Sequence, residues 1–196
     1  MSKAEQIVKI ENVVATSELK HGIDLKTVSK AFPEAEYRPK QFPGLVFILK
    51  KPRVTYLIFR TGKMVCTGAR SEREAERALR KLVRALKEGG IIIEGKPEIK
   101  VVNIVASANL GGSVDLSELY ESERDMRGGI IYEPEQFPGL IYRMEDPRAV
   151  FLIFSSGKVV CTGARKEEDV HQAVIKLKQK LEEKNLIYHL TQNFSR

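Results

Sequence analysis

Long hydrophobic runs are missing from this chain of 196 residues, so no segment is expected to span a membrane. The N-terminal stretch MSKAEQIVKIEN has no apolar core of the kind that a secretory signal needs. Hydrophobic residues still make up 42% of the sequence, which is enough to bury a proper core. We therefore expect a folded cytoplasmic protein.

Residues for metal binding and nucleophilic catalysis are also scarce. Cys66 and Cys161 belong to no CxxC motif, and the three histidines show no metal-ligand spacing or paired nucleophile. No glycine-rich loop precedes a helix in the pattern that cradles phosphate groups. We expect both cysteines to be inert strand residues, although a disulfide or metal site stays open where symmetry brings them close. We expect no enzyme, no cofactor and no metal.

A long internal repeat organises the chain. Residues 37–70 return 95 positions later as residues 132–165, and 20 of the 34 aligned residues are identical. The retained residues include glycine, proline, phenylalanine, threonine and basic residues, whereas a core alone would tolerate aliphatic exchange. The repeat predicts two pseudo-symmetric halves, residues 1–97 and residues 98–196, the second with a short C-terminal tail.

Charge is divided unequally between these halves. Residues 1–97 carry 20 Lys and Arg against 11 Asp and Glu, whereas residues 98–196 carry 13 against 15. A basic surface favours a polyanion such as nucleic acid. The acidic balance of the second half indicates that part of its surface meets a different partner.

Each half reads as strand, helix, strands and helix. Strands are predicted at 7–16, 45–50, 54–60 and 63–70, with a short helix after Asp24. A long amphipathic helix begins at a capping box of Ser71 and Glu74, and its counterpart covers about 167–184. The fold class is therefore α+β, with about five antiparallel strands and two helices in each repeat. The last ten or so residues show no clear pattern.

Both faces of the predicted strands are largely apolar. In 54–59, alternate residues place Thr55, Leu57 and Phe59 on one face, and in 64–69 they place Val65, Thr67 and Ala69 together. Each half has only enough helix to cover one face, so we expect the second face to be exposed and to bind a ligand. The alternative is that the two sheets pack against each other.

Basic residues flank this apolar face, which favours the minor groove of DNA over burial. Sugars line that groove, phosphates run along both edges, and A·T pairs offer only acceptors, which Asn and Thr can meet. Phe42 and Phe59, like Phe137 and Phe154, lie beside turns at both ends of the face. Taken singly they would be core aromatics, but as pairs they are typical of wedges that enter between base steps.

The repeated motifs QFPGL, PR, LIF, SGK or TGK and VCTGAR resemble the core of the TATA-box-binding protein family, over roughly residues 7–185. The resemblance is to the archaeal type, since no extra region precedes the core. It implies a saddle whose continuous concave ten-stranded sheet grips the minor groove of a TATA-like element. It also implies a general transcription initiation factor that recruits transcription factor B and RNA polymerase, and that acts at the nucleoid of an archaeal cell.

The resemblance further implies a role for individual residues. The intercalating pairs are Phe42 with Phe59 and Phe137 with Phe154; the residues that hydrogen-bond in the minor groove are Asn12, Asn103, Thr67 and Thr162. The apolar contacts are Val14, Val65, Val105, Val160, Leu57 and Leu152; the phosphate contacts are Arg53, Lys63, Arg70, Arg148, Lys158 and Arg165. Glu133 and Glu135 replace Arg38 and Lys40 of the first copy, which fits a contact with factor B, although two exposed carboxylates in a turn are often only solvated.

Two other classes of function stay open. One is a sheet-based protein that binds single-stranded RNA and stacks its phenylalanines on unpaired bases. The other is an interaction protein whose sheet buries against a partner or against itself. The sequence also leaves open whether the chain forms a homodimer in the absence of DNA.

Overall fold

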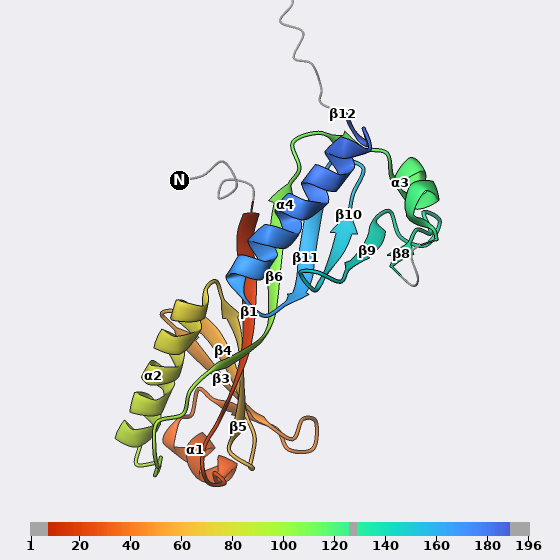
Figure 1. The fold of residues 1–196 in the computed structure, drawn as a ribbon. Coiled ribbons are helices and arrows are strands. Elements are labelled where there is room, and N and C mark those ends of the chain that lie inside the picture. Colours follow the sequence, from red (N-terminus) through yellow and green to blue (C-terminus); the bar gives the residue numbers. More distant parts are fainter. Residues whose placement is uncertain (1–7, 126–128, 189–196) are drawn as a thin grey trace, which may run out of the picture. The chain divides into compact units, whose positions relative to one another are not determined.

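The computed structural model describes residues 8–125 and 129–188 (Figure 1). They form two compact units: one holds Glu11–Asn103, and the other holds the described residues before and after that range. The first repeat contains β1 (Val8–Glu18), α1 (Leu25–Ala31), β2 (Glu36–Tyr37), β3 (Leu45–Lys50), β4 (Arg53–Ile58), β5 (Lys63–Ala69) and α2 (Glu72–Glu88). The second contains β6 (Lys100–Asn109), β7 (Ser113–Val114), α3 (Leu116–Glu123), β8 (Ile130–Ile131), β9 (Leu140–Met144), β10 (Ala149–Ile153), β11 (Lys158–Ala164), α4 (Glu167–Glu183) and β12 (Ile187–Tyr188).

Antiparallel strand pairing builds each repeat in the same way. The hydrogen-bonded order is β2-β3-β4-β5-β1 in the first repeat and β6-β11-β10-β9-β8 in the second, and the ten strands form one sheet. The predicted α+β class, the duplication and the five main strands of each repeat are confirmed. Strands β1 and β6 both cross the boundary between the compact units, which the sequence did not indicate.

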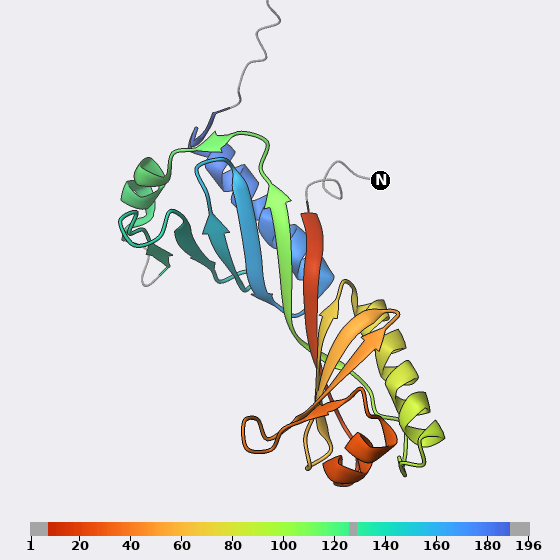
Figure 2. The same cartoon turned by 180° about the vertical axis from the view of Figure 1, so that it is seen from behind.

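One long helix covers one face of the strands in each repeat. Figure 1 shows α4 lying across β6, β11 and β10, and in the reverse view of Figure 2 these strands lie in front of the helix. The apolar side of α4 is buried through Val170, Val174, Leu177 and Leu181. We call the opposite side of the strands, in each repeat separately, the open face.

Helix caps agree with the sequence, with one difference in detail. The Asp24 carboxylate accepts the backbone N–H groups of Lys26 and Thr27 at the start of α1. Ser71 accepts the backbone N–H of Glu74 at 3.1 Å, as the capping box predicts. The Glu74 carboxylate, however, accepts the N–H of Arg70 at 2.6 Å, because the chain enters the helix directly from β5.

A β-bulge corrects the predicted faces of β5. Alternation puts Ala69 on the open face, but Ala69 is fully buried and Gly68 is exposed. The register of β1 against β5 shifts between Val13 and Ala15, and Gly68 has a φ of +99°, a conformation that L side chains rarely adopt. The extra residue turns Ala69 toward the helix side, and β11 repeats the arrangement at Gly163 with a φ of +92°.

A second, two-stranded sheet was not predicted. Strand β12 pairs with β7 through Ile187 and Val114, so the chain has regular structure to Tyr188. Gly112 makes the close approach possible, since a Cβ atom there would lie 2.7 Å from Ile187 Cγ2. The rest of the predicted C-terminal tail lies outside the described residues.

No helix in the described ranges is long and apolar enough to cross a membrane.

Candidate nucleic-acid interface

The open face of each repeat carries the predicted contact residues at intermediate exposure. Strand alternation buries the helix-side residues and leaves their neighbours half-exposed, as in β4, where Val54, Tyr56 and Ile58 are buried. The half-exposed residues of the first repeat are Asn12, Val14, Leu57, Val65 and Thr67, and those of the second are Asn103, Val105, Leu152, Val160 and Thr162. Among its predicted contacts, each repeat therefore combines three apolar side chains with one amide and one hydroxyl group.

Two hydrogen bonds hold Asn12 in one orientation. Its Oδ1 accepts the backbone N–H of Gly68 at 2.7 Å, and its Nδ2 donates to Thr67 Oγ1 at 3.1 Å. The bulge exposes the Gly68 N–H, so the same irregularity that buries Ala69 also orients the amide. With Oδ1 occupied by a donor, the side chain can offer an external ligand the remaining N–H of Nδ2.

The phenylalanines form one pair in each repeat. The ring centroids of Phe42 and Phe59 are 5.8 Å apart with an interplanar angle of 64°, and those of Phe137 and Phe154 are 6.0 Å apart at 66°. Both are edge-to-face contacts, the arrangement that aromatic rings prefer. Phe137 is 39% exposed, which is unusual for a ring of this size and excludes a purely core role for it.

A buried glycine lies beneath each pair. A Cβ atom on Gly44 would lie 2.7 Å from Phe42 Cε1 and 3.1 Å from Phe59 Cε1. Gly139 repeats both distances against Phe137 and Phe154. The glycine of each QFPGL motif therefore lets the two rings come together beside the sheet.

The six predicted phosphate-contact residues are all exposed, namely Arg53, Lys63, Arg70, Arg148, Lys158 and Arg165. They lie at the ends of β4, β5, β10 and β11 or directly beside them. Each stands at the rim of an apolar strip, where a cation can reach a phosphate without being buried.

Glu133 and Glu135 lie in an exposed turn that precedes β9. The Glu133 carbonyl accepts the backbone N–H groups of Gln136 and Phe137, both at 2.9 Å. In the first repeat the Arg38 carbonyl accepts those of Gln41 and Phe42 in the same way. The two turns thus share one backbone conformation and carry opposite charge.

The open face also contains residues that the sequence reasoning did not assign to the site. Val46, Thr55 and Thr16 are half-exposed in the first repeat, and Ile48 is 54% exposed. Alternation had already placed Thr55 on this face beside Leu57, without giving it a contact role, and alternation from Val14 would have added Thr16. The repeats differ here, because Val150 stands where the first repeat has Thr55.

Both cysteines are free and buried. Burial raises the pKa of the Cys66 thiol and raises that of Cys161 to about 12. Within the described ranges, no group of three or more His, Cys, Asp or Glu residues gathers where it could hold a metal ion.

Comparisons with known proteins agree with this geometry. The model of the family described as "Transcription factor TFIID (or TATA-binding protein, TBP)" matches residues 7–89 and again residues 98–184. The TATA-box-binding protein of Pyrobaculum calidifontis is 51% identical over 188 residues, which cover 96% of this chain and 92% of that protein. That of Sulfurisphaera tokodaii is 53% identical over 178 residues, which cover 90% of this chain and 87% of the relative.

A solved structure shares the fold. The structure titled "Methanococcus jannaschii TBP" matches with a TM-score of 0.80 and 48% sequence identity, covering 90% of this chain and 99% of that one. The family model matches both repeats, and the relatives align over nearly their whole length. The chain therefore belongs to the TATA-binding protein family.

Proposed function

We propose that this protein is a general transcription initiation factor that binds A·T-rich, TATA-like promoter DNA in the minor groove through its open faces. The observation that carries the proposal is the pairing of an exposed apolar strip with two phenylalanines, repeated in both halves. An apolar strip with few hydrogen-bonding groups matches a groove whose walls are sugars and whose floor offers mainly acceptors.

Asn12, Thr67, Asn103 and Thr162 would supply the donors for that floor. Minor-groove acceptors are nearly the same for A·T and T·A, while G·C adds the N2 amino group of guanine, which a donor on the protein cannot meet. Selectivity for A·T therefore follows from the oriented Asn12 amide. Deformability of the bound sequence adds to it, and the TATA-binding protein is itself a standard example of DNA kinking.

The phenylalanine pairs would enter between base steps at the two ends of the site and kink the duplex. Entry of an apolar side chain costs a few kcal/mol of unstacking and is offset by contacts with the bent duplex. Edge-to-face packing over Gly44 and Gly139 holds the rings ready for this role without reorganisation.

Energy transfer across a short end-labelled duplex tests the proposal. Binding of the unchanged protein to a TATA-like duplex should bring the ends markedly closer, whereas a G·C-rich duplex and single strands should not respond. Phe137→Ala with Phe154→Ala should reduce the shortening more than it reduces salt-dependent association. Equal shortening by this variant would remove the wedge role.

Single-stranded RNA remains the second candidate ligand, because exposed phenylalanines also stack on unpaired bases. Tighter binding to single strands than to the TATA-like duplex would overturn duplex binding and favour that candidate. A stable homodimer with no salt-dependent nucleic-acid binding would instead favour the interaction protein.

The bound complex would then recruit transcription factor B and RNA polymerase at the archaeal nucleoid. The acidic turn at Glu133 and Glu135 supports a separate protein contact, since carboxylates at that position repel phosphate and attract a basic partner.

A further inference from the structure

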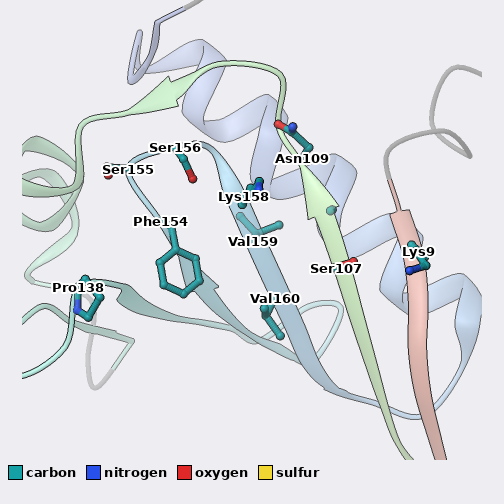
Figure 3. A pocket seen from close by; sticks show the side chains of 11 residues that line it. Lys9, Ser107, Asn109, Pro138, Phe154, Ser155, Ser156, Lys158, Val159 and Val160 are labelled. Carbon is teal, nitrogen blue, oxygen red and sulfur yellow. The ribbon is translucent and has the colours of Figure 1, made fainter. Parts of the chain in front are cut away.

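Each repeat contains a hollow beside one of its phenylalanines. The larger has a volume of about 730 Å³ and is shown in Figure 3. Its lining residues are Lys9, Ser107, Ala108, Asn109, Pro138, Phe154, Ser155, Ser156, Lys158, Val159 and Val160, and we call it the Lys9 hollow. Its counterpart, the Lys100 hollow, has a volume of about 690 Å³ and is lined by Thr16, Ser17, Glu18, Phe59, Thr61, Lys63, Met64, Val65, Glu98 and Lys100.

One lysine of each hollow comes from the other repeat. In Figure 3 the lining side chains come from three neighbouring strands, with Lys9 on β1, Ser107 on β6 and Lys158 on β11, and from the loops that hold Pro138 and Phe154. Lys9 belongs to the first repeat of the sequence, but it lies in the compact unit that holds the second. Lys100 begins the second repeat and lies in the unit of the first, because β1 and β6 run from one unit into the other.

The chemistry of the Lys9 hollow matches one sugar–phosphate unit. Phe154, Val160 and Pro138 give it an apolar wall against which a deoxyribose can pack. Exposed Lys9 and Lys158 supply two positive charges, and Ser107 and Ser156 supply hydroxyl donors for phosphate oxygens. Among the described residues that line it there is no carboxylate.

The Lys100 hollow differs from the Lys9 hollow in the charge of its lining residues, although its volume is similar. Glu18 and Glu98 line it together with Lys63 and Lys100, so the formal charges of its described lining residues sum to zero, whereas those of the Lys9 hollow sum to +2. The position of Glu18 is taken by Asn109 in the second repeat. A phosphate is therefore attracted more strongly to the Lys9 hollow.

We propose that the Lys9 hollow is a phosphate-binding site in which Lys9, lent by the first repeat, and Lys158 hold the nucleic-acid backbone beside the Phe154 wedge. The inference rests on the proposed duplex binding and deepens it, because it adds a contact residue and makes the two hollows unequal in their attraction for phosphate. Lys9 acts by charge and position, so it should strengthen binding of all sequences alike.

The test is the salt dependence of binding of the full chain to a TATA-like duplex. Lys9→Gln should weaken binding several-fold and make the slope of log K against log salt shallower by about one, with an unchanged preference for A·T over G·C. Lys100→Gln should have the smaller effect. Lys30→Gln, which makes the same charge change on α1, is the matched control. Equal slopes for Lys9→Gln and Lys30→Gln would overturn the proposal.

A duplex with single neutral methylphosphonates locates the contact. When the methylphosphonate stands at one position next to the kink, the parent protein and Lys9→Gln should bind the duplex with equal affinity, because the phosphate charge that Lys9 meets is gone. If Lys9→Gln weakens binding to every substituted duplex alike, Lys9 acts only through the general field and the site does not exist. If the parent protein fails to bind the duplex at all, it is the proposed function that fails.

The charge difference supplies a gain-of-binding test. Glu18→Asn copies the second repeat into the Lys100 hollow and should strengthen duplex binding and enlarge the effect of Lys100→Gln. An unchanged effect of Lys100→Gln in this background would contradict the assignment of the hollows to phosphate.

Discussion

Asn12 is held by two groups of the neighbouring strand, the N–H of Gly68 and the hydroxyl of Thr67. A side-chain amide that is free to flip would present a donor or an acceptor with similar ease, and it could not distinguish base pairs by their acceptors. The bulge at Gly68 removes that freedom before any ligand arrives. The donor that Asn12 would offer to a base under the proposed function is therefore set by the irregularity of β5.

Asn12→Ala should narrow the preference for A·T over G·C duplexes by about tenfold, because a good base contact contributes about 1–3 kcal/mol to discrimination. Asn103→Ala should act in the same direction. The measurement is a pair of dissociation constants, one for each duplex, at a fixed salt concentration.

Thr55→Ala on the same face serves as the control, since Thr55 shares the exposure of Asn12 but is not one of the proposed base contacts. An unchanged ratio of the two constants for Asn12→Ala would exclude Asn12 as a reader of bases.

At the scale of elements, the two repeats fix their helices to the sheet by different chemistry. In the first repeat Phe32 packs edge-to-face on Phe47, with ring centroids 5.2 Å apart. In the second repeat Glu123, only 5% exposed, takes the place of Phe32 and bonds to both Lys180 and Lys184. Lys180 Nζ also donates to the Tyr142 hydroxyl at 2.8 Å, so α3, α4 and β9 meet at one charged cluster.

Acid should weaken this cluster selectively. Burial opposes ionisation of Glu123, but hydrogen bonds from Lys180 and Lys184 outweigh it and lower the pKa of the carboxyl. Because the pKa of Glu123 is lower in the folded protein than in the unfolded chain, its ionised form stabilises the fold at pH values above the unfolded-state pKa. This stabilisation is lost as the pH falls through the folded-state pKa. Glu123→Gln should therefore lower the free energy of unfolding by about 1–3 kcal/mol near neutral pH and by less in acid.

The measurement is denaturant unfolding of the parent and Glu123→Gln at a series of pH values. A difference between the two proteins that stays constant down to strongly acidic pH would show that the charge of Glu123 contributes nothing.

The first repeat also shows how the charged cluster can be replaced. Glu123→Phe with Lys180→Ala and Lys184→Gly copies Phe32, Ala85 and Gly89 of the first repeat. Glycine is needed at the third position, because a Cβ atom on Gly89 would lie 2.5 Å from Phe32 Cζ. Replacing a buried ion cluster by packed apolar groups is often neutral or stabilising.

We expect the triple variant to regain the midpoint of thermal unfolding of the parent, whereas Glu123→Phe alone should be destabilised by its clash with the two lysines. A triple variant no more stable than Glu123→Phe would mean that the repeats cannot exchange this contact.

The acidic turn before β9 is an element whose role can be separated from DNA binding. Glu133→Arg with Glu135→Arg restores the charge of the first repeat on the same backbone turn. Duplex binding should persist, while formation of the ternary complex with factor B should weaken, measured as a mobility shift with and without factor B. Normal ternary-complex formation would make these carboxylates solvated surface only.

The elements themselves were largely predictable from the sequence, whereas the exceptions arise from contacts remote in the chain. Period-2 and helical patterns placed β3, β4, α2 and α4 within one or two residues. The bulge at Gly68 was not predicted, because its only signal in the sequence is a single glycine within a strand. The pairing of β12 with β7 and the place of Lys9 depend on residues some seventy or more positions away, and no local pattern records such contacts.

For the whole molecule, the number of phosphate contacts sets how steeply duplex binding weakens as the salt concentration rises. With six predicted phosphate contacts, the slope of log K against log salt should be about −5, since each contact releases condensed counterions. A titration of duplex binding over a range of potassium chloride concentrations measures it. Neutralising Arg53 or Arg148 singly should each make the slope shallower by about one.

A slope near zero would mean that the exposed basic rim does not meet phosphates.

The division of residues into repeats 1–97 and 98–196 remains a prediction, because the compact units are cut elsewhere, at Glu11 and Ile104.

Each hollow contains one lysine from the other repeat, and this exchange bears on how the two repeats arose from one ancestral copy. A single ancestral copy could have completed such a hollow only by taking the strand of a second, identical chain, and both hollows would then have been alike. Once both copies lie in one gene, each can mutate separately, and Glu18 and Asn109 now differ at equivalent positions of the two hollows. A symmetric pair would present two identical hollows to a duplex, whereas the two hollows of this chain differ in charge. Such a difference is what a preference for one orientation on the duplex would require, and the duplication supplied the two copies in which it could arise.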